Sequence, residues 1–387
     1  MKILAASAAV VIFSITAFNP SSFTKQTSGR TPKNPVSGEQ KIQVAILLDV
    51  SNSMDGLIEQ AKAQLWNMVT VMSKTKCETG NPKIEIALYE YGRTDNDAQV
   101  GYVKQISGFS SDLDQLSMEL FKLTTNGGDE YCGQVIYTSL EGLQWDPSPS
   151  SYKTIFIAGN EDFWQGKVSY TKACEEARKK GVIVNTIYCG DREMGIQEHW
   201  NLSGECGNGS FTNINQDAKI EDIPTPYDST LITLNYRLNS TYLYYGERGA
   251  LNYEHQRTAD NLNAEFGNTA SVKRVQAKSM VNGYVNYSWD LVDASRADSN
   301  FFKKVEIKTL PDSLKNKSRE EIRETINKKA TERLAIQTEI QRVSNQRTKY
   351  LFAERAKSAA NNNTPTLESE VEKIIRTQVK RFKMKID

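Results

Sequence analysis

The stretch VAILLDVSNSM, residues 44–54, runs from an apolar segment directly into an acid and two hydroxyls. Its apolar part predicts a strand that is buried on both faces and ends at Asp49. Residues 56–74 follow with apolar side chains along one stripe, the pattern of a helix that covers such a strand. This strand and helix begin an alternation that continues to about residue 217.

The alternation predicts an α/β fold with a doubly wound, mainly parallel six-stranded sheet. Residues 101–109 can pair back on residues 83–92 as a hairpin, which makes one edge strand antiparallel. In folds of this class, ligands bind beyond the carboxyl ends of the strands, where Asp49 lies. The other strand patterns lie at 152–160, 182–190 and 210–214, and the helix patterns at 112–123, 133–145 and 170–181.

Asp49, Ser51 and Ser53 alternate at the end of the first strand, so their three oxygens can meet above the sheet edge. Carboxylate and hydroxyl oxygens are ligands for hard divalent cations such as Mg²⁺, Mn²⁺ or Ca²⁺. The same pattern also occurs where serines cap a helix. In this position, DVSNS resembles the metal-ion-dependent adhesion site of von Willebrand factor A (VWA) domains. The resemblance covers residues 41–217 and implies that these three residues ligate a metal.

Two later loops depart from the VWA pattern. The loop TTNGGDEYCG (124–133) has its threonines before the paired glycines, whereas the family often has a threonine after them. The loop FIAGNEDF (156–163) has Gly159 where the family has an aspartate. We therefore expect an altered site with Asp129 and Glu161 as substitute ligands, or a site that has lost its metal. The residues expected to face a bound partner are Gly128, Glu130, Asn160 and Asp162.

The N-terminal segment predicts that the protein is exported. Residues 1–18 have the layout of a signal peptide or an N-terminal membrane anchor, with Lys2 before an uncharged apolar stretch. Residues 19–40 are rich in Ser, Thr, Pro, Gly and Lys, and we expect a flexible linker there. The expected location is extracytoplasmic, in the periplasm, the cell envelope or the medium, and the alternative is a cytosolic protein.

The five cysteines leave at least one thiol without a partner in the same chain. Cys132 and Cys189 both fall at the predicted carboxyl edge of the sheet, which makes them the expected disulfide pair. Cys174 lies within a helix pattern, and we expect it to be a buried thiol.

Residues 218–387 are predicted to be helical, with amphipathic and coiled-coil-like segments. In residues 318–351, Lys329 and Arg333 interrupt the apolar seam, which favours a helical hairpin over a long coiled coil. The region resembles the C-terminal parts of exported bacterial proteins that contain a VWA domain, and this resemblance implies no function for it.

Composition and motifs argue against two classes of function. A net charge of +1 gives the chain no strong attraction to nucleic acid, and membrane contact is expected only through an uncleaved N-terminal anchor. The chain has no nucleophile-elbow, P-loop, zinc-protease or paired-cysteine redox motif, so we expect no enzyme. His199, beside a tryptophan in a predicted helix, is expected to be packed rather than to act as a general base.

Three hypotheses of function follow. The favoured one is a binding module that engages a protein or cell-surface ligand through the metal-site face. The alternative is a scaffold that self-associates through its C-terminal helices and carries a metal-free VWA head. The third is a hydrolase that uses two pairs of adjacent acids, Asp129–Glu130 and Glu161–Asp162.

Overall fold

The structure, a computed structural model, describes residues 39–78, 80–204, 208–218, 222–298, 300–357 and 366–386. The predicted signal peptide and almost all of the predicted linker lie outside these residues. In the part of the chain that is described, no helix is both long enough and apolar enough to cross a membrane.

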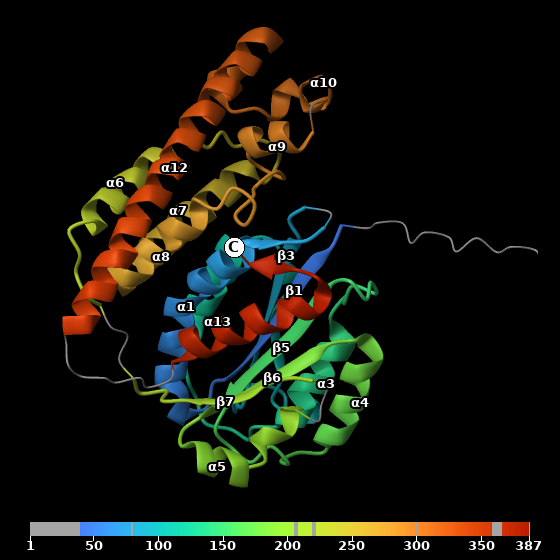
Figure 1. The fold of residues 1–387 in the computed structure, drawn as a ribbon. Helices are drawn as coiled ribbons and strands as arrows, with labels where there is room; N and C mark the ends of the chain where they lie inside the picture. The colour runs from blue at the N-terminus through green and yellow to red at the C-terminus, as the bar shows by residue number, and fades with distance from the viewer. Residues whose placement is uncertain are drawn as a thin grey trace, which may run out of the picture. The chain divides into compact units, whose positions relative to one another are not determined.

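A six-stranded sheet with the order β4-β3-β1-β5-β6-β7 forms the centre of the α/β unit (Figure 1). Neighbouring strands are parallel except β3 and β4, which are antiparallel. The predicted fold class is therefore confirmed. The continuous apolar run of β1 suits a central strand that is covered on both faces. The strands are β1 (Lys41–Asp49), β3 (Lys83–Tyr91), β4 (Lys104–Ser110), β5 (Tyr152–Gly159), β6 (Ile183–Cys189) and β7 (Phe211–Ile214).

Helices cover both faces of this sheet (Figure 1). Ile42 and Val44 of β1 belong to the core on the α1 side, whereas Ala45 and Leu47 belong to the core on the α3 side. The helices are α1 (Asp55–Ser73), α2 (Leu113–Lys122), α3 (Cys132–Gly142), α4 (Tyr170–Lys180) and α5 (Arg192–Gln197), and the 3₁₀ turns are η1 (Asn52–Met54), η2 (Ala98–Val100) and η3 (Trp200–Gly204).

The last described segment of the chain returns to the α/β unit. Helix α13 (Leu367–Gln378) packs beside α1, where the Leu367 backbone N–H donates to Oε1 of Gln60 at 3.1 Å. Its last residue, Gln378, accepts a hydrogen bond from the hydroxyl of Tyr152 at 2.9 Å. The turn η5 (Val379–Phe382) then leads to β8 (Lys385–Ile386), which pairs with β2 (Thr75–Lys76). The predicted boundary at residue 217 is therefore amended, because residues 367–386 belong to the α/β unit.

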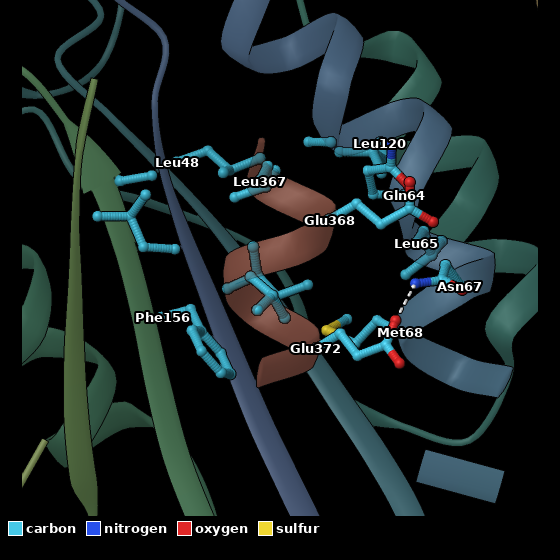
Figure 2. Close-up of a pocket in the computed structure, with 15 residues that line it drawn as sticks. Leu48, Gln64, Leu65, Asn67, Met68, Leu120, Phe156, Leu367, Glu368 and Glu372 are labelled. Carbon is cyan, nitrogen blue, oxygen red and sulfur yellow. Dashed lines mark hydrogen bonds between the residues drawn. The ribbon is translucent and has the colours of Figure 1, made fainter. Parts of the chain in front are cut away.

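An apolar cavity of about 50 Å³ lies between α1, α13 and the sheet (Figure 2). Leu48 and Phe156 line it from the strands, and Leu367 lines it from α13. At its edge, Asn67 of α1 donates a hydrogen bond to Glu372 of α13 at 3.4 Å. Small-molecule pockets usually have about 300–1,000 Å³. The cavity is therefore a loosely packed seam under α13 and not a small-molecule site.

Residues 228–357 form a helical insertion between β7 and α13. Its longest element, α12, is one helix of 39 residues, so the predicted helical hairpin is wrong. The insertion consists of α6 (Asp228–Asn239), α7 (Gly249–Phe266), α8 (Asn268–Lys278), α9 (Leu291–Ala297), α10 (Phe301–Lys304), η4 (Ile307–Thr309), α11 (Asp312–Lys315) and α12 (Arg319–Lys357).

Arg333 explains why α12 continues through the interrupted seam. Its side chain is buried, and its guanidinium bonds to Asp290 at 2.6 Å and to Asp293 at 2.9 Å. The guanidinium carbon also lies 4.0 Å from the centre of the Tyr242 ring. A buried arginine with carboxylate partners packs like a core residue, so it does not end the helix.

A buried ionic cluster fastens the helical insertion to the α/β unit. Asp260 of α7 bonds to Nε of Arg274 and to Nζ of Lys278, both at 2.8 Å. Arg274 also reaches Asp114 of α2 at 2.6 Å, and its guanidinium carbon lies 4.1 Å from the centre of the Trp66 ring. Buried charges are tolerated only when they are paired. The cluster therefore fixes how α7 and α8 pack on α2 and α1.

The predicted Cys132–Cys189 disulfide is wrong, because both residues are buried free thiols. Both lie near the carboxyl edge, but Cys132 belongs to the core on the α3 side and Cys189 to the core on the α1 side. The sheet therefore separates their side chains. Cys174, expected to be a buried thiol, is disulfide-bonded.

Candidate functional site

Asp49 is the last residue of β1 and lies at the carboxyl edge in the middle of the sheet. Its side chain is fully buried, and its Oδ1 accepts a hydrogen bond from the Ser51 backbone N–H at 2.7 Å. Its Oδ2 has no hydrogen-bond partner among the described residues. Burial raises the pKa of Asp49 to about 7, against the lowering effect of hydrogen bonding from Ser51 and from the Asn160 backbone, and the Glu161 carboxylate adds to the rise. The centre of the site is thus an acid without a counter-charge.

Ser51 and Ser53 place their hydroxyl oxygens 3.3 Å apart beside Asp49. Ser51 is the N-cap residue of η1, but its side chain makes no capping hydrogen bond. The interpretation of this serine as only a helix cap is therefore not supported. Nδ2 of Asn160 donates to the Ser53 hydroxyl at 3.4 Å, so the first and third loops meet at the serines.

The second loop brings Glu130 to Asp49. A Cβ added at Gly92 would lie 2.7 Å from Cγ of Glu130 and 3.0 Å from Oδ1 of Asp49, so both side chains border this glycine. Glu130 is only 7% exposed. Burial raises the pKa of Glu130 to about 8, and the carboxylates of Asp49 and Glu161 contribute to the rise. Two buried acids therefore share one small space.

Asp129 and Gly128, two other predicted site residues of this loop, have different surroundings. Asp129 is exposed, and its Oδ2 accepts a hydrogen bond from the hydroxyl of Tyr131 at 3.0 Å. Gly128 lies against the end of β3, because an added Cβ would be 2.6 Å from the carbonyl oxygen of Gly92. Glycine at this position lets the second loop approach β3 closely enough to deliver Glu130.

The third loop has no room for the aspartate of the VWA pattern. A Cβ added at Gly159 would already lie 2.5 Å from the hydroxyl oxygen of Tyr91 and 3.0 Å from Oδ2 of Asp49. The Tyr91 hydroxyl is held there because it donates to the carbonyl oxygen of Ala158 at 3.0 Å. The space of the missing carboxylate is thus occupied by a tyrosine from β3.

The remaining residues of the third loop differ in their burial and in their contacts. Oδ1 of Asn160 is buried without a hydrogen-bond partner among the described residues. Glu161 is exposed. Asp162 lies farther out, where it accepts from the Trp164 backbone N–H at 2.9 Å and contacts Nδ1 of His199 at 3.2 Å. Asp162 therefore belongs to the rim of the site and not to its centre.

The side chains of Asp49, Ser51, Ser53, Glu130 and Asn160 form an inner cluster. This cluster has the chemistry that a hard divalent cation requires. Its donors are carboxylate, hydroxyl and amide oxygens, and two buried oxygens, on Asp49 and Asn160, lack a partner in the described part of the chain. No basic side chain is among the main groups that shift the pKa of Asp49 or Glu130. Three or more acidic, histidine or cysteine side chains do not converge on one point within the described residues. Serine and asparagine oxygens would therefore complete the coordination.

Sequence reasoning missed three features of this site: the burial of Glu130, the Tyr91 hydroxyl and the bordering glycine at position 92. The paired glycines before Glu130 were the one local signal that the second loop makes a close approach. Gly92, the last residue of the predicted strand 83–92, has a φ of 81°, a conformation that favours glycine. The contact of Tyr91 with Gly159 depends on the β3-β1-β5 strand order, which the local pattern does not reveal.

No protein-family model and no curated protein matches this chain. Among solved structures, the SpRpn10 VWA domain is 13% identical with a TM-score of 0.35, and the match covers 46% of this chain and 90% of that one. Proximal thread matrix protein 1 from the mussel byssus, solved with a zinc-occupied MIDAS motif, is 15% identical with a TM-score of 0.33. That match covers 45% of this chain and 42% of the mussel protein, so it spans less than half of either.

Proposed function

We propose that this protein is an exported, non-catalytic binding protein that engages another protein or a cell-surface component through the carboxyl edge of its sheet. We further propose that Asp49, Ser51 and Ser53 hold a hard divalent cation, Mg²⁺, Mn²⁺ or Ca²⁺, at that edge. The observation that carries the proposal is the buried Oδ2 of Asp49, which has no hydrogen-bond partner in the described part of the chain. A bound cation would supply the missing partner.

Each residue of the cluster has a distinct part in this proposal. Asp49 supplies the buried carboxylate, and Ser51 and Ser53 supply hydroxyl oxygens 3.3 Å apart. Glu130 replaces Asp129 as the acid of the second loop, because its side chain borders the same glycine as Asp49. Glu161 contributes negative charge from the exposed side. When bound, the cation would supply positive charge and coordination positions for water or a partner group.

Two observations support export and a non-catalytic role. Cys174 is disulfide-bonded, and such bonds persist mainly in oxidising compartments. The ring of His199 stacks on Trp164 with centroids 3.9 Å apart, and its Nδ1 contacts Asp162. None of the described hydrogen bonds links this imidazole to a hydroxyl or thiol that it could activate.

Divalent cations are expected to stabilise the wild-type protein and not the Asp49→Ala variant. A ligand at about 100 times its dissociation constant adds about 2.7 kcal/mol to the free energy of unfolding. The measurement is a thermal unfolding series of the full chain with chelator and with each of the three cations. Calorimetric titration then gives the affinity.

Ser240→Ala is the matched control for this series. Ser240 is exposed in the helical insertion and donates only to the Arg237 carbonyl oxygen at 2.7 Å, so its variant should keep the cation response. Thr241 is a poor control because its hydroxyl accepts from buried Arg333 at 3.0 Å. If none of the three cations shifts the wild-type transition, the cation proposal is rejected and the face must bind without a metal.

A second candidate function, assembly through the helical insertion, is favoured by exposed apolar side chains. Phe352 and Leu334 on α12 are 77% and 58% exposed, and Tyr236 on α6 is 70% exposed. Sedimentation of wild type against Phe352→Glu would detect an oligomer that depends on this surface. Deleting residues 219–387 is unsuitable, because it would also remove α13 from the sheet.

A further inference from the structure

We propose that the partner segment that docks on this edge presents lysine or arginine side chains, and not the acidic side chain that a cation-centred site would capture. This inference rests on the proposed function only for the identity of the binding face. It assigns the chemical class of the partner from charge and from one exposed aromatic residue.

Negative charge is concentrated in the loops around Asp49. Four segments at this edge, residues 92–103, 124–131, 160–168 and 190–199, the last of which includes α5, each contain two or three acidic residues and at most one lysine or arginine. The whole chain, by contrast, has a net charge of +1, so the excess is local. A surface that carries one sign of charge attracts groups of the opposite sign and repels groups of the same sign.

The inner cluster offers acceptors and few donors. Oδ2 of Asp49 is buried without a partner in the described residues, and so is Oδ1 of Asn160. With a divalent cation in place, the carboxylates of Asp49 and Glu130 would already balance its two charges. Glu161 would then leave the site negative, so an incoming carboxylate would meet net repulsion. A cationic side chain would meet attraction with or without the metal.

Trp164 provides a surface suited to such a cation. It is 56% exposed, and it is the one tryptophan among the exposed large hydrophobic residues of the described chain. Its ring stacks on His199 at 3.9 Å and 15°, and it lies parallel to Tyr170 at 6.3 Å. Oδ1 of Asp162 accepts from the Trp164 backbone N–H at 2.9 Å and lies 3.2 Å from Nδ1 of His199, the ring on which this tryptophan stacks. His199 covers one face of the Trp164 ring, so a lysine or arginine would bind to the part that remains exposed.

The test measures binding of fluorescently labelled oligolysine and oligoglutamate peptides of equal length to the full chain. Each titration is run with chelator and with Mg²⁺ or Mn²⁺, at about 0.05 M and about 0.5 M salt, so that screening is varied. We expect oligolysine to bind with an affinity that falls at high salt, and to change the tryptophan fluorescence of the wild type but not that of Trp164→Ala. Trp164→Ala should weaken its binding about threefold. Tyr287→Ala, which removes an exposed aromatic side chain of the helical insertion, should leave it unchanged.

The outcomes separate this inference from the proposed function. Cation-dependent binding of oligoglutamate would overturn the inference and leave the cation site standing. Binding of neither peptide, or equal loss in Trp164→Ala and Tyr287→Ala, would also overturn the inference. A further outcome is oligolysine binding that depends on Trp164 while none of the three cations shifts the thermal transition. This result would support the inference and reject the cation site.

Discussion

Replacing Asp260 by alanine is expected to lower the free energy of unfolding by about 3–5 kcal/mol, because it removes the central acid of a buried ionic cluster. Asp260 bonds to Arg274 and Lys278 at 2.8 Å, and Nδ2 of Asn235 donates to it at 3.0 Å. Arg274 and Lys278 are almost fully buried. Without Asp260, the Lys278 ammonium would lose its carboxylate partner, and Arg274 would keep Asp114 as its one carboxylate partner, beside the Gln256 carbonyl oxygen.

Urea denaturation of wild type and Asp260→Ala measures this loss. Asp312→Ala is the matched control, because Asp312 pairs with Lys315 at 2.7 Å on an exposed helix and its removal should leave the midpoint unchanged. A loss for Asp260→Ala no larger than that of the control would show that the cluster does not hold the helical insertion in place.

Replacing Asp49 by asparagine is expected to raise the stability of the cation-free protein at about pH 8 by as much as about 4 kcal/mol. The cause is the burial that raises the pKa of this carboxyl from 3.8 to about 7, so ionising it costs free energy in the folded state. Asparagine keeps an oxygen for the Ser51 N–H and carries no charge. The same variant should no longer be stabilised by divalent cations. A variant that is more stable and yet does not respond to cations would show that the Asp49 charge serves cation binding and not folding.

The sign of the pH dependence provides a second check on Asp49. Because its folded pKa lies above its unfolded value, the wild-type carboxyl favours the folded state fully below about pH 4 and loses this contribution as pH rises to about 7. Glu130, with a folded pKa of about 8, extends the loss to higher pH. The advantage of Asp49→Asn should therefore grow between about pH 4 and about pH 8 in chelator. An advantage that is constant with pH, or a variant less stable than wild type at pH 8, would contradict this account.

The parts of the fold that were predictable from sequence are those with a local cause. The apolar run before Asp49 identified the central strand because both of its faces are covered, and alternation after it identified the sheet class. Asp49, Ser51 and Ser53 were placed correctly at one edge because their spacing fixes their common direction.

The parts that were missed depend on contacts between distant segments. Glu130 rather than Asp129 turns inward because Gly92 gives it space. Cys132 and Cys189 share an edge but not a face, and the faces are decided by the register of the helix and the strand on the sheet. In the sequence, Arg333 interrupts the apolar seam of α12. In the structure this arginine is paired with Asp290 and Asp293, which lie too far away in the sequence for the local pattern to reveal the pairing.

The return of α13 and β8 to the α/β unit also sets an order of events during synthesis. A ribosome releases the strands and α1 early, but the sheet face near Leu48 stays uncovered until residues 367–386 have emerged. A chain that folds from its N-terminus exposes such apolar surface, and can aggregate through it, until its C-terminal segment has been synthesised. A product truncated just before Leu367 would keep every strand of the main sheet and still lack its last cover. Premature termination near that point should therefore yield chains that are degraded or aggregate, despite having nearly all of the sequence.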